Sequence, residues 1–321
     1  MSDTTSGVAR AAVDEARADA VGGEKPAIRL RHVTRRFGRR TVVDDVSLDC
    51  PAGSLTGLIG LNGAGKSTLL RTAVGLIAPT DGTSILAGYD AHAEPVEIKR
   101  KVGYVPDRPN IYGWMTTESA TEFVAQFHEK FDWQRCGELV KRFRLPMTTK
   151  VKHLSKGQAA KLQLLLAVCH DPDVLILDEP TGGFDPIVRE EFFQSVLEIA
   201  TSRGRTVLLS SHALADMQRL ADRIALMHDG QLILSGTTDE ILGRVKRVRV
   251  VLDDGTPAPP VPPDVLRQTR DGREWLITVD RFGPTTLDGL RDRPGVRLDV
   301  MDLTLDDVFK DVVRGREEAE S

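Results

Sequence analysis

The chain has 321 residues and a formal net charge of −4. This length can bury one large core and a second, smaller one, and the charge balance gives no overall basic field of the kind that binds nucleic acid. Its three cysteines, Cys50, Cys136 and Cys169, lack C-x-x-C spacing and are typical of cytosolic thiols, and no apolar run approaches the roughly 18 residues that a membrane helix needs.

The first 25 residues are rich in Ala, Asp, Glu and Gly. They lack the basic start and apolar middle of a secretory signal. We therefore expect residues 1–25 to form a disordered tail, and the first domain to begin at residue 26.

Residues 60–68, with the sequence GLNGAGKST, match the phosphate-binding loop pattern G-x-x-x-x-G-K-[ST]. The apolar run 55–59 predicts a buried strand before the loop, and helical spacing over 67–77 predicts a helix after it. This order directs backbone N–H groups towards an anion at the positive end of the helix. We predict a nucleoside triphosphate site in which Lys66 reaches the β- and γ-phosphates and Ser67 ligates Mg²⁺. The predicted contacts are Gly60, Leu61, Asn62, Gly63, Ala64, Gly65, Lys66, Ser67 and Thr68.

From residue 116 to residue 170 the apolar spacing is helical, which predicts a helical subdomain inserted after the phosphate loop. Within it, Ser155 and Gln158 have the S-x-x-Q spacing of a capping box. This pair predicts the start of an apolar helix over 159–169. A capped helix with no further role is the simpler alternative for these two residues.

Two later strands are predicted to end beside the phosphate site. The apolar run 174–177 is followed by Asp178 and Glu179, the pattern of a central strand that ends at a catalytic edge. We expect Asp178 to hold hydrated Mg²⁺ and Glu179 to take a proton from the attacking water; a solvated turn is the alternative. The run 206–210 predicts another buried strand, and His212 follows it directly.

The segment 154–158, LSKGQ, resembles the LSGGQ signature of ABC ATPases, with Lys156 in place of the first signature glycine. The order of phosphate loop, signature, carboxylate strand, Asp185 and His212 is also that family's order. The resemblance covers about residues 28–240. It implies an α/β fold: a phosphate-loop ABC ATPase domain with a mixed sheet core and a helical signature subdomain.

The resemblance also implies roles for residues outside the phosphate loop. The signature helix start would face the γ-phosphate of an ATP held by a second subunit, and the loop PTGGFDP would cross the dimer interface. An aromatic side chain near the domain's start would stack on the base, and His212 would act as the switch histidine that contacts the γ-phosphate. The ATP contacts implied in this way are Phe37, Ser155, Gly157, Gln158 and Asp185.

One position departs from the family pattern. The predicted strand 101–105 leads to Asp107, which takes the place of the family's Q-loop glutamine. A carboxylate can still ligate Mg²⁺ through oxygen, but it donates no hydrogen bond and adds negative charge near phosphate. We predict Asp107 as a metal ligand whose coupling role differs from that of glutamine.

The ATPase domain is expected to occupy residues 26–243, and a small C-terminal α/β domain residues 244–315, followed by a tail over 316–321. A basic, valine-alternating run at its start is explained more simply by a half-exposed strand than by a binding patch. A T-x-x-D cap predicts the start of the last helix at Thr304 and Asp307. The strands predicted in this part are 245–252, 274–279 and 296–300.

We infer the ATP-binding and ATP-hydrolysing subunit of an ABC transporter, with ATP and Mg²⁺ as cofactors. The ending TLDDVFKDVV resembles ATPases of exporter-type permeases. The implied partners are a separate membrane permease and a second ATPase domain, in a homodimer or heterodimer, with no nucleic acid expected. The implied location is cytoplasmic, peripheral at the inner face of the membrane through the permease.

Two other functions are alternatives. The first is a soluble ABC ATPase that acts on the ribosome or on DNA, but such members usually carry two cassettes or a long coiled coil between the phosphate loop and the signature, and this sequence shows neither. The second is a phosphate-loop kinase or GTPase, which would leave LSKGQ unexplained and would usually carry N-K-x-D for guanine.

Overall fold

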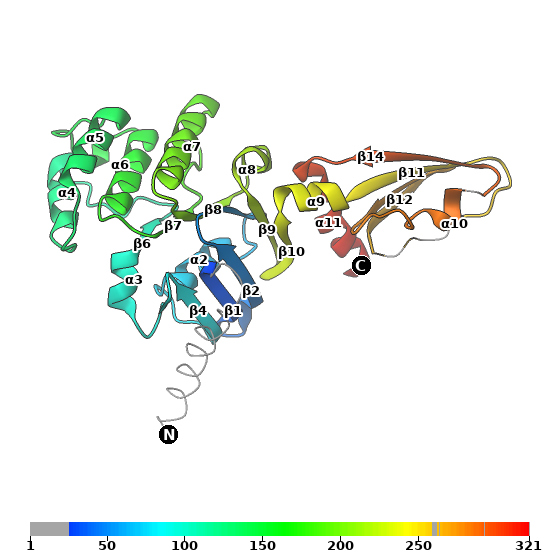
Figure 1. Cartoon of the computed structure of the whole chain (residues 1–321), viewed down its shortest axis with the longest axis horizontal. Coiled ribbons are helices and arrows are strands. Elements are labelled where there is room, and N and C mark those ends of the chain that lie inside the picture. Colours follow the sequence, from blue (N-terminus) through cyan, green and yellow to red (C-terminus); the bar gives the residue numbers. More distant parts are fainter. Residues whose placement is uncertain (1–25, 259–261, 263, 292, 321) are drawn as a thin grey trace, which may run out of the picture. The chain divides into compact units, whose positions relative to one another are not determined.

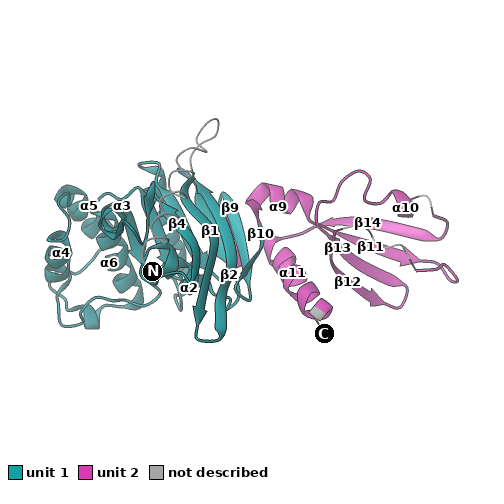
Figure 2. Ribbon diagram, turned by 90° about the horizontal axis from the view of Figure 1, so that it is seen from below, with its two compact units in different colours: residues 1–212, 220–234 teal, residues 213–219, 235–321 magenta. Residues whose placement is uncertain are grey.

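The computed structural model describes residues 26–258, 262, 264–291 and 293–320, so the tail predicted over 1–25 lies outside the described residues. The chain divides into two compact units (Figure 2). The first comprises the residues up to His212 with Leu220–Leu234, and the second comprises Ala213–Arg219 with the residues from Ser235 onward. The continuous part of the second unit therefore begins at Ser235, earlier than the predicted boundary at residue 244, and the unit also includes the short helical segment Ala213–Arg219.

The first unit contains a six-stranded sheet in the order β10-β9-β3-β8-β7-β6 (Figure 1). Parallel pairs join β3 to β8 and β9, and β7 to β6 and β8. The carboxyl ends of parallel strands meet at one edge, so the segments that follow β3, β7 and β8 are brought together. The strands are β3 (Leu55–Ile59), β6 (Val102–Val105), β7 (Val174–Asp178), β8 (Thr206–Ser211), β9 (Arg223–His228) and β10 (Gln231–Thr237).

A second, antiparallel sheet in this unit has the order β2-β1-β4-β5. Its strands are β1 (Pro26–Phe37), β2 (Arg40–Pro51), β4 (Asp81–Leu86) and β5 (Tyr89–Asp90). Helix α2 (Lys66–Ala73) contributes Leu69 and Leu70 to a core shared by the two sheets. The helix ends before the predicted residue 77, because Gly75 adopts a φ of +77° and a Cβ there would lie 2.3 Å from the carbonyl oxygen of Ala91.

The predicted helical subdomain is present, and α6 is its most buried helix. Leu162, Leu164 and Leu165 are fully buried, as expected for a helix that is apolar on most of its faces. Figure 1 shows α4, α5 and α6 grouped beside α7. Besides α2, the helices of this unit are α3 (Pro95–Lys101), α4 (Thr117–Ala125), α5 (Trp133–Phe143), the 3₁₀ turn Val151–His153, α6 (Lys156–Val168) and α7 (Pro186–Thr201).

The second unit is built on an antiparallel sheet in the order β12-β13-β11-β14. Alternate residues of β11, such as Val248 and Val250, face an apolar core that α10 closes. Thr304 and Asp307 form the predicted cap of α11, with the Asp307 N–H donating to Thr304 Oγ1 at 3.2 Å. The elements are α8 (Leu214–Leu220), α9 (Thr238–Arg244), β11 (Lys246–Leu252), β12 (Val265–Asp271), β13 (Glu274–Val279), α10 (Asp288–Arg291), β14 (Val296–Asp302) and α11 (Leu305–Glu320).

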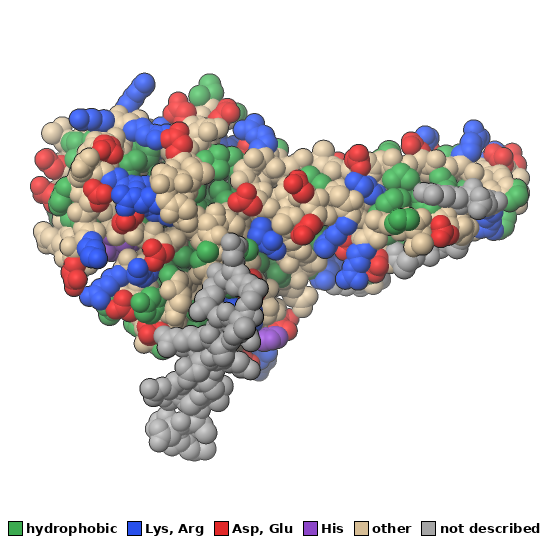
Figure 3. All heavy atoms as spheres, in the orientation of Figure 1, with side chains coloured by type: hydrophobic (Ala, Val, Ile, Leu, Met, Phe, Trp, Pro, Cys, Tyr) green, Lys and Arg blue, Asp and Glu red, His purple; other side chains and the backbone are tan. Residues whose placement is uncertain are grey.

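Two expectations for this unit need correction. Strand β12 is not among the strands that the sequence predicts, because its apolar alternation is weak and a proline-rich stretch precedes it. The tail predicted over 316–321 is helical as far as Glu320, since α11 continues through it. Among the described residues, no helix has both the length and the apolarity needed to cross a membrane. Acidic and basic side chains are interspersed on the face shown in Figure 3.

Candidate nucleotide site

The phosphate loop joins β3 to α2, and close packing fixes its glycines. Gly65 caps α2 with a φ of +100°, and a Cβ at this position would lie 2.5 Å from the carbonyl oxygen of Val42. A Cβ on Gly60 would lie 2.4 Å from the carbonyl oxygen of Met227. The loop is also held by the Gly230 N–H, which donates to the Ala64 carbonyl at 3.0 Å. Any larger residue at these glycines would displace backbone that shapes the anion cradle.

Lys66 is buried at the centre of this loop. Its Nζ donates to the carbonyl oxygens of Gly60 at 2.7 Å and Leu61 at 3.2 Å. It also forms an ion pair with Glu179 Oε1 at 3.1 Å. The structure therefore joins the predicted phosphate-binding cation directly to the predicted general base.

Asp178 is fully buried at the end of β7. Its Oδ1 accepts hydrogen bonds from Ser67 Oγ at 2.8 Å and from Ser210 Oγ at 3.0 Å. Its Oδ2 has no hydrogen-bond partner among the described residues, and Arg71 Nη2 lies 3.9 Å away. Burial raises the pKa of the Asp178 carboxyl above its usual value, although the two hydroxyl groups oppose that shift.

These oxygens fit a hydrated Mg²⁺. Ser67 Oγ and the Asp178 carboxylate are hard donors within hydrogen-bond distance of each other, and Asp178 Oδ2 is unbonded. No group of three or more His, Cys, Asp or Glu side chains that could hold a metal occurs in the described part of the chain. Mg²⁺ commonly takes one or two protein oxygens and completes its shell with water and phosphate. The ion would therefore be held jointly with a nucleotide.

Glu179 and His212, the two predicted catalytic residues, are in contact. Glu179 Oε2 and His212 Nδ1 are 2.7 Å apart. The Glu179 N–H donates to Ser210 Oγ at 2.9 Å, and its φ of +46° is rare for a residue with a side chain. Such strain costs about 1–3 kcal/mol and is found mostly at functional sites. Ser210 thus orients both carboxylate residues, a role that sequence reasoning missed although this serine lies at the end of the predicted strand.

Asp107 contacts helix α2 through Arg71. Its Oδ1 accepts a hydrogen bond from Arg71 Nη2 at 3.2 Å. The hydroxyl-bearing side chain of Tyr104, with Asp178 and Asp107, raises the pKa of Arg71. The carboxylate at the glutamine position is thus paired with a cation. Sequence reasoning missed Arg71, although it lies four residues after Ser67 and hence on the same helix face.

The signature segment forms the predicted capping box. Ser155 Oγ accepts from the Gln158 N–H at 3.2 Å, and Gln158 Oε1 accepts from the Ser155 N–H at 3.0 Å. A Cβ on Gly157 would lie 2.8 Å from Val188 in α7. Asp185 caps α7 by accepting from the N–H groups of Ile187 and Val188. In the contacts of this single chain, these residues bond to their own helix starts rather than to Lys66 or Ser67.

Phe37 lies at the end of β1 and is 46% exposed. The guanidinium of Arg35 lies 4.5 Å from the centre of its ring. An exposed, partly stacked ring is suited to contact with a planar group. Its role in holding a nucleotide base stays a prediction.

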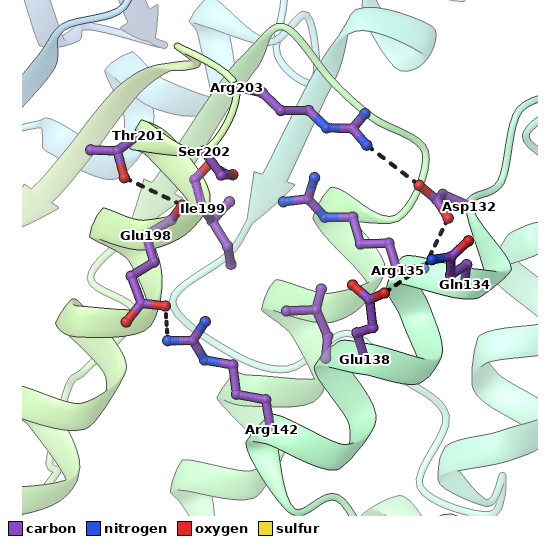
Figure 4. Close-up of a pocket in the computed structure, with 11 residues that line it drawn as sticks. Asp132, Gln134, Arg135, Glu138, Arg142, Glu198, Ile199, Thr201, Ser202 and Arg203 are labelled. Atoms are coloured by element: carbon purple, nitrogen blue, oxygen red, sulfur yellow. Dashed lines mark hydrogen bonds and ion pairs between the residues drawn. The ribbon is translucent and has the colours of Figure 1, made fainter.

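A cavity of about 570 Å³ lies elsewhere in the first unit, between α5 and α7 (Figure 4). Its charged side chains form ion pairs with one another, including Arg203 with Asp132 at 3.6 Å and Arg142 with Glu198. None of the residues predicted to bind or hydrolyse a nucleotide lines it. We therefore do not assign this cavity to the reaction.

Residues 43–182 match the family model described as ABC transporter. The chain is 30% identical over 226 residues to the ABC transporter ATP-binding protein YtrB of Bacillus subtilis, covering 70% of this chain and 77% of that protein. It is 32% identical over 219 residues to the "Probable multidrug ABC transporter ATP-binding protein YbhF" of Escherichia coli, covering 67% of this chain and 38% of that protein. A solved ATP binding subunit of an ABC transporter superposes with a TM-score of 0.62 at 30% identity, covering 67% of this chain and 91% of that one.

Proposed function

Because this chain belongs to the ABC transporter ATP-binding proteins, we propose that this ATPase is the subunit of an exporter that drives a separate membrane permease. The name of the E. coli relative, with its reference to multidrug transport, supports the exporter assignment. The segment 304–313, with its resemblance to ATPases of exporter-type permeases, supports it as well. In this proposal the chain works at the cytoplasmic face of the membrane, through its permease.

The observation that carries the mechanism is the position of the Glu179 carboxylate, 3.1 Å from Lys66 Nζ and 2.7 Å from His212 Nδ1. The loop N–H groups and Lys66 bind the phosphates of ATP. Ser67 and Asp178 would hold Mg²⁺, which would supply neutralising charge to the phosphate oxygens. Glu179 accepts the proton of the attacking water, and His212 holds that carboxylate in place.

We further propose that two ATPase domains close around two nucleotides. Ser155 caps the positive end of α6, the signature helix, and lies exposed. A helix end of this kind attracts phosphate. Each nucleotide would then lie between the phosphate loop of one subunit and the signature helix of the other. ATP binding closes the pair and hydrolysis reopens it.

A hydrophobic groove beside Asp107 supports the permease as partner. It has a volume of about 640 Å³, and Phe127 at its border is 71% exposed. Phe127, Phe123, Tyr112 and Trp114 form successive aromatic contacts along this surface. We assign the groove to an amphipathic helix of the permease, because such a helix buries its apolar face in a hydrophobic groove. Apolar lining residues include Leu76, Val96, Pro106, Ile111, Val124 and Leu166.

The proposal is tested by purifying the chain from its own cells in mild detergent and identifying the multi-span membrane protein that accompanies it. Phe127→Glu should abolish this association and leave the ATPase rate of the isolated chain unchanged. Trp133→Glu is the matched control, because Trp133 is 55% exposed and also contacts another aromatic ring but does not line the groove. Equal loss with both variants, or none with either, contradicts the groove assignment.

A further inference from the structure

Strand β14 forms one edge of the sheet in the second unit and pairs with β11 (Figure 1). The pairing runs without a register shift from Lys246 opposite Asp302 to Leu252 opposite Val296. A regular edge strand presents a row of backbone donors and acceptors on its open side. It is therefore able to accept another strand.

The opposite edge, β12, differs in two ways. Its register shifts between Val265 and Arg267, which disturbs the backbone row. Helix α11 also packs against it: a Cβ on Gly315 would lie 1.8 Å from the carbonyl oxygen of Leu266, and Arg267 forms an ion pair with Glu318 at 2.8 Å. Of the two edges of this sheet, β14 is the regular one.

The backbone hydrogen bonds show which residues of β14 face the open side. The Asp253 N–H donates to the Gly295 carbonyl at 2.8 Å, so residue 295 and, by alternation, 297, 299 and 301 direct their backbone groups towards β11. The backbone groups of Leu298 and Val300 and the carbonyl of Val296 therefore point to the open edge, whereas the Val296 N–H donates to the Arg293 carbonyl at 3.3 Å within the preceding turn. An added antiparallel strand must match these three residues.

We propose that the occupant is β14 of a second copy of this chain, paired antiparallel about a two-fold axis at Leu298. In this register Arg297 lies opposite the partner's Asp299, and Asp299 lies opposite the partner's Arg297. Val296 lies opposite the partner's Val300, which covers a valine that is 42% exposed. Both charged pairs occupy non-hydrogen-bonded positions, where cross-strand side chains are closest.

Other registers lack this complementarity. A shift of the two-fold axis by one residue places Asp299 opposite the partner's Asp299, or Arg297 opposite the partner's Arg297. Like charges directly opposite each other are destabilising. If the two-fold axis passed between two residues, residues whose backbone groups point to the open edge would lie opposite residues whose groups point away from it. The inter-strand hydrogen bonds could then not form. The sequence of this edge therefore favours one arrangement with a copy of itself.

The two charged side chains are available for this contact. Arg297 is 79% exposed, and its nearest acidic oxygen, on Asp253, lies 3.4 Å away, an exposed pair of little energetic weight. Asp299 is opposite Arg249, whose guanidinium donates to Glu274 at 2.7 and 2.8 Å. The contact needs no nucleotide, and because it is self-complementary it would favour a homodimer.

The test uses sedimentation velocity of the full chain in EDTA without nucleotide. Arg297→Glu and Asp299→Arg should each weaken dimerisation at least about tenfold, because both symmetry-related pairs change from attraction to repulsion. An equimolar mixture of the two variants should recover dimer, since every pair is again of opposite sign. Arg270→Glu on β12 is the control and should dimerise as the unchanged chain does. An unchanged urea unfolding transition of the second unit, followed by Trp275 fluorescence on β13, shows that this unit is folded in each variant.

Cross-linking gives a second readout. Mixed Arg297→Cys and Asp299→Cys chains should form a disulfide-linked dimer under oxidation, because the two Cα atoms would lie about 4.5 Å apart. Each variant alone should not do so. A chain that is monomeric without nucleotide overturns the proposal, as does a dimer that is insensitive to both charge reversals or a mixture that fails to recover.

Discussion

Asp178 in the first unit and Asp311 in the second are both buried carboxylates, but their surroundings differ. Asp311 Oδ2 accepts from Arg247 Nη2 at 2.7 Å and also from Thr278 Oγ1, and its Oδ1 accepts from Arg267 at 3.4 Å. Asp178 Oδ1 has two hydroxyl donors, whereas its Oδ2 has none among the described residues. Both oxygens of Asp311 are bonded within the fold, whereas Asp178 has one oxygen without a partner among the described residues.

This difference distinguishes a buried carboxylate that stabilises the fold, Asp311, from one that is available for a ligand, Asp178. A buried charge is tolerated when cations and hydrogen bonds surround it. Arg247 and Arg267 meet this condition by joining β11 and β12 to α11. Asp178 does not meet this condition, because its Oδ2 has no hydrogen-bond partner among the described residues. A carboxylate oxygen without such a partner is available to ligate a metal ion. The incompletely bonded Asp178 oxygen is therefore a feature of the candidate nucleotide site, and the fully bonded Asp311 is a feature of the second unit's packing.

The largest expected effect concerns Glu179, the neighbour of the incompletely bonded carboxylate. Glu179→Gln should lower the steady-state ATPase rate by roughly 10² to 10⁴, the usual weight of general-base catalysis, with ATP binding retained and a closed dimer trapped. Glu198→Gln, which removes a carboxylate from a surface ion pair with Arg142, is the control and should keep the wild-type rate. Near-normal turnover by Glu179→Gln would assign the base to another residue.

The second prediction compares the two buried aspartates directly. Asp311→Asn should destabilise the second unit by about 2–4 kcal/mol, because the partly buried Arg247 and Arg267 lose the charged group that they share. Asp178→Asn should leave stability unchanged or raised, because it removes an incompletely paired charge, while it abolishes ATP hydrolysis. Urea unfolding of the full chain, followed together with ATPase rate, measures both effects. Equal destabilisation by the two substitutions would refute the distinction between them.

The smallest effect is expected at Asp107. Its ion pair with Arg71 is partly exposed and contributes at most about 1 kcal/mol. Asp107→Gln should preserve or modestly raise MgATP affinity, because it removes negative charge near phosphate, whereas Asp107→Ala should chiefly lower hydrolysis or its coupling to transport. Nucleotide affinity and ATPase rate with and without permease discriminate the forms. Identical behaviour of all three would leave Asp107 as an ordinary loop residue.

Local patterns explain what could be predicted along the chain. The phosphate loop, the strand before Asp178 and the capping box at Ser155 each depend on residues close in sequence, and the structure contains all three elements. Strand β12 was missed because its pattern is weak and its place is set by pairing with β13. The sequence also did not predict that α8 belongs to the second unit. The Leu305 N–H donates to Gln218 Oε1 at 2.9 Å, and this contact between distant residues ties α8 to the C-terminal part of the chain.

The sequence by itself determined the family and the α/β class, and it predicted the residues that would contact phosphate, because spacing within a loop or helix start dictates where backbone donors point. Only the tertiary structure decided the partners of those residues. The contacts of Glu179 with Lys66 and His212, and of Asp107 with Arg71, join elements far apart in the chain. The alignment of parallel strands and the packing of α2 between two sheets bring these side chains together, and no local pattern encodes such distances.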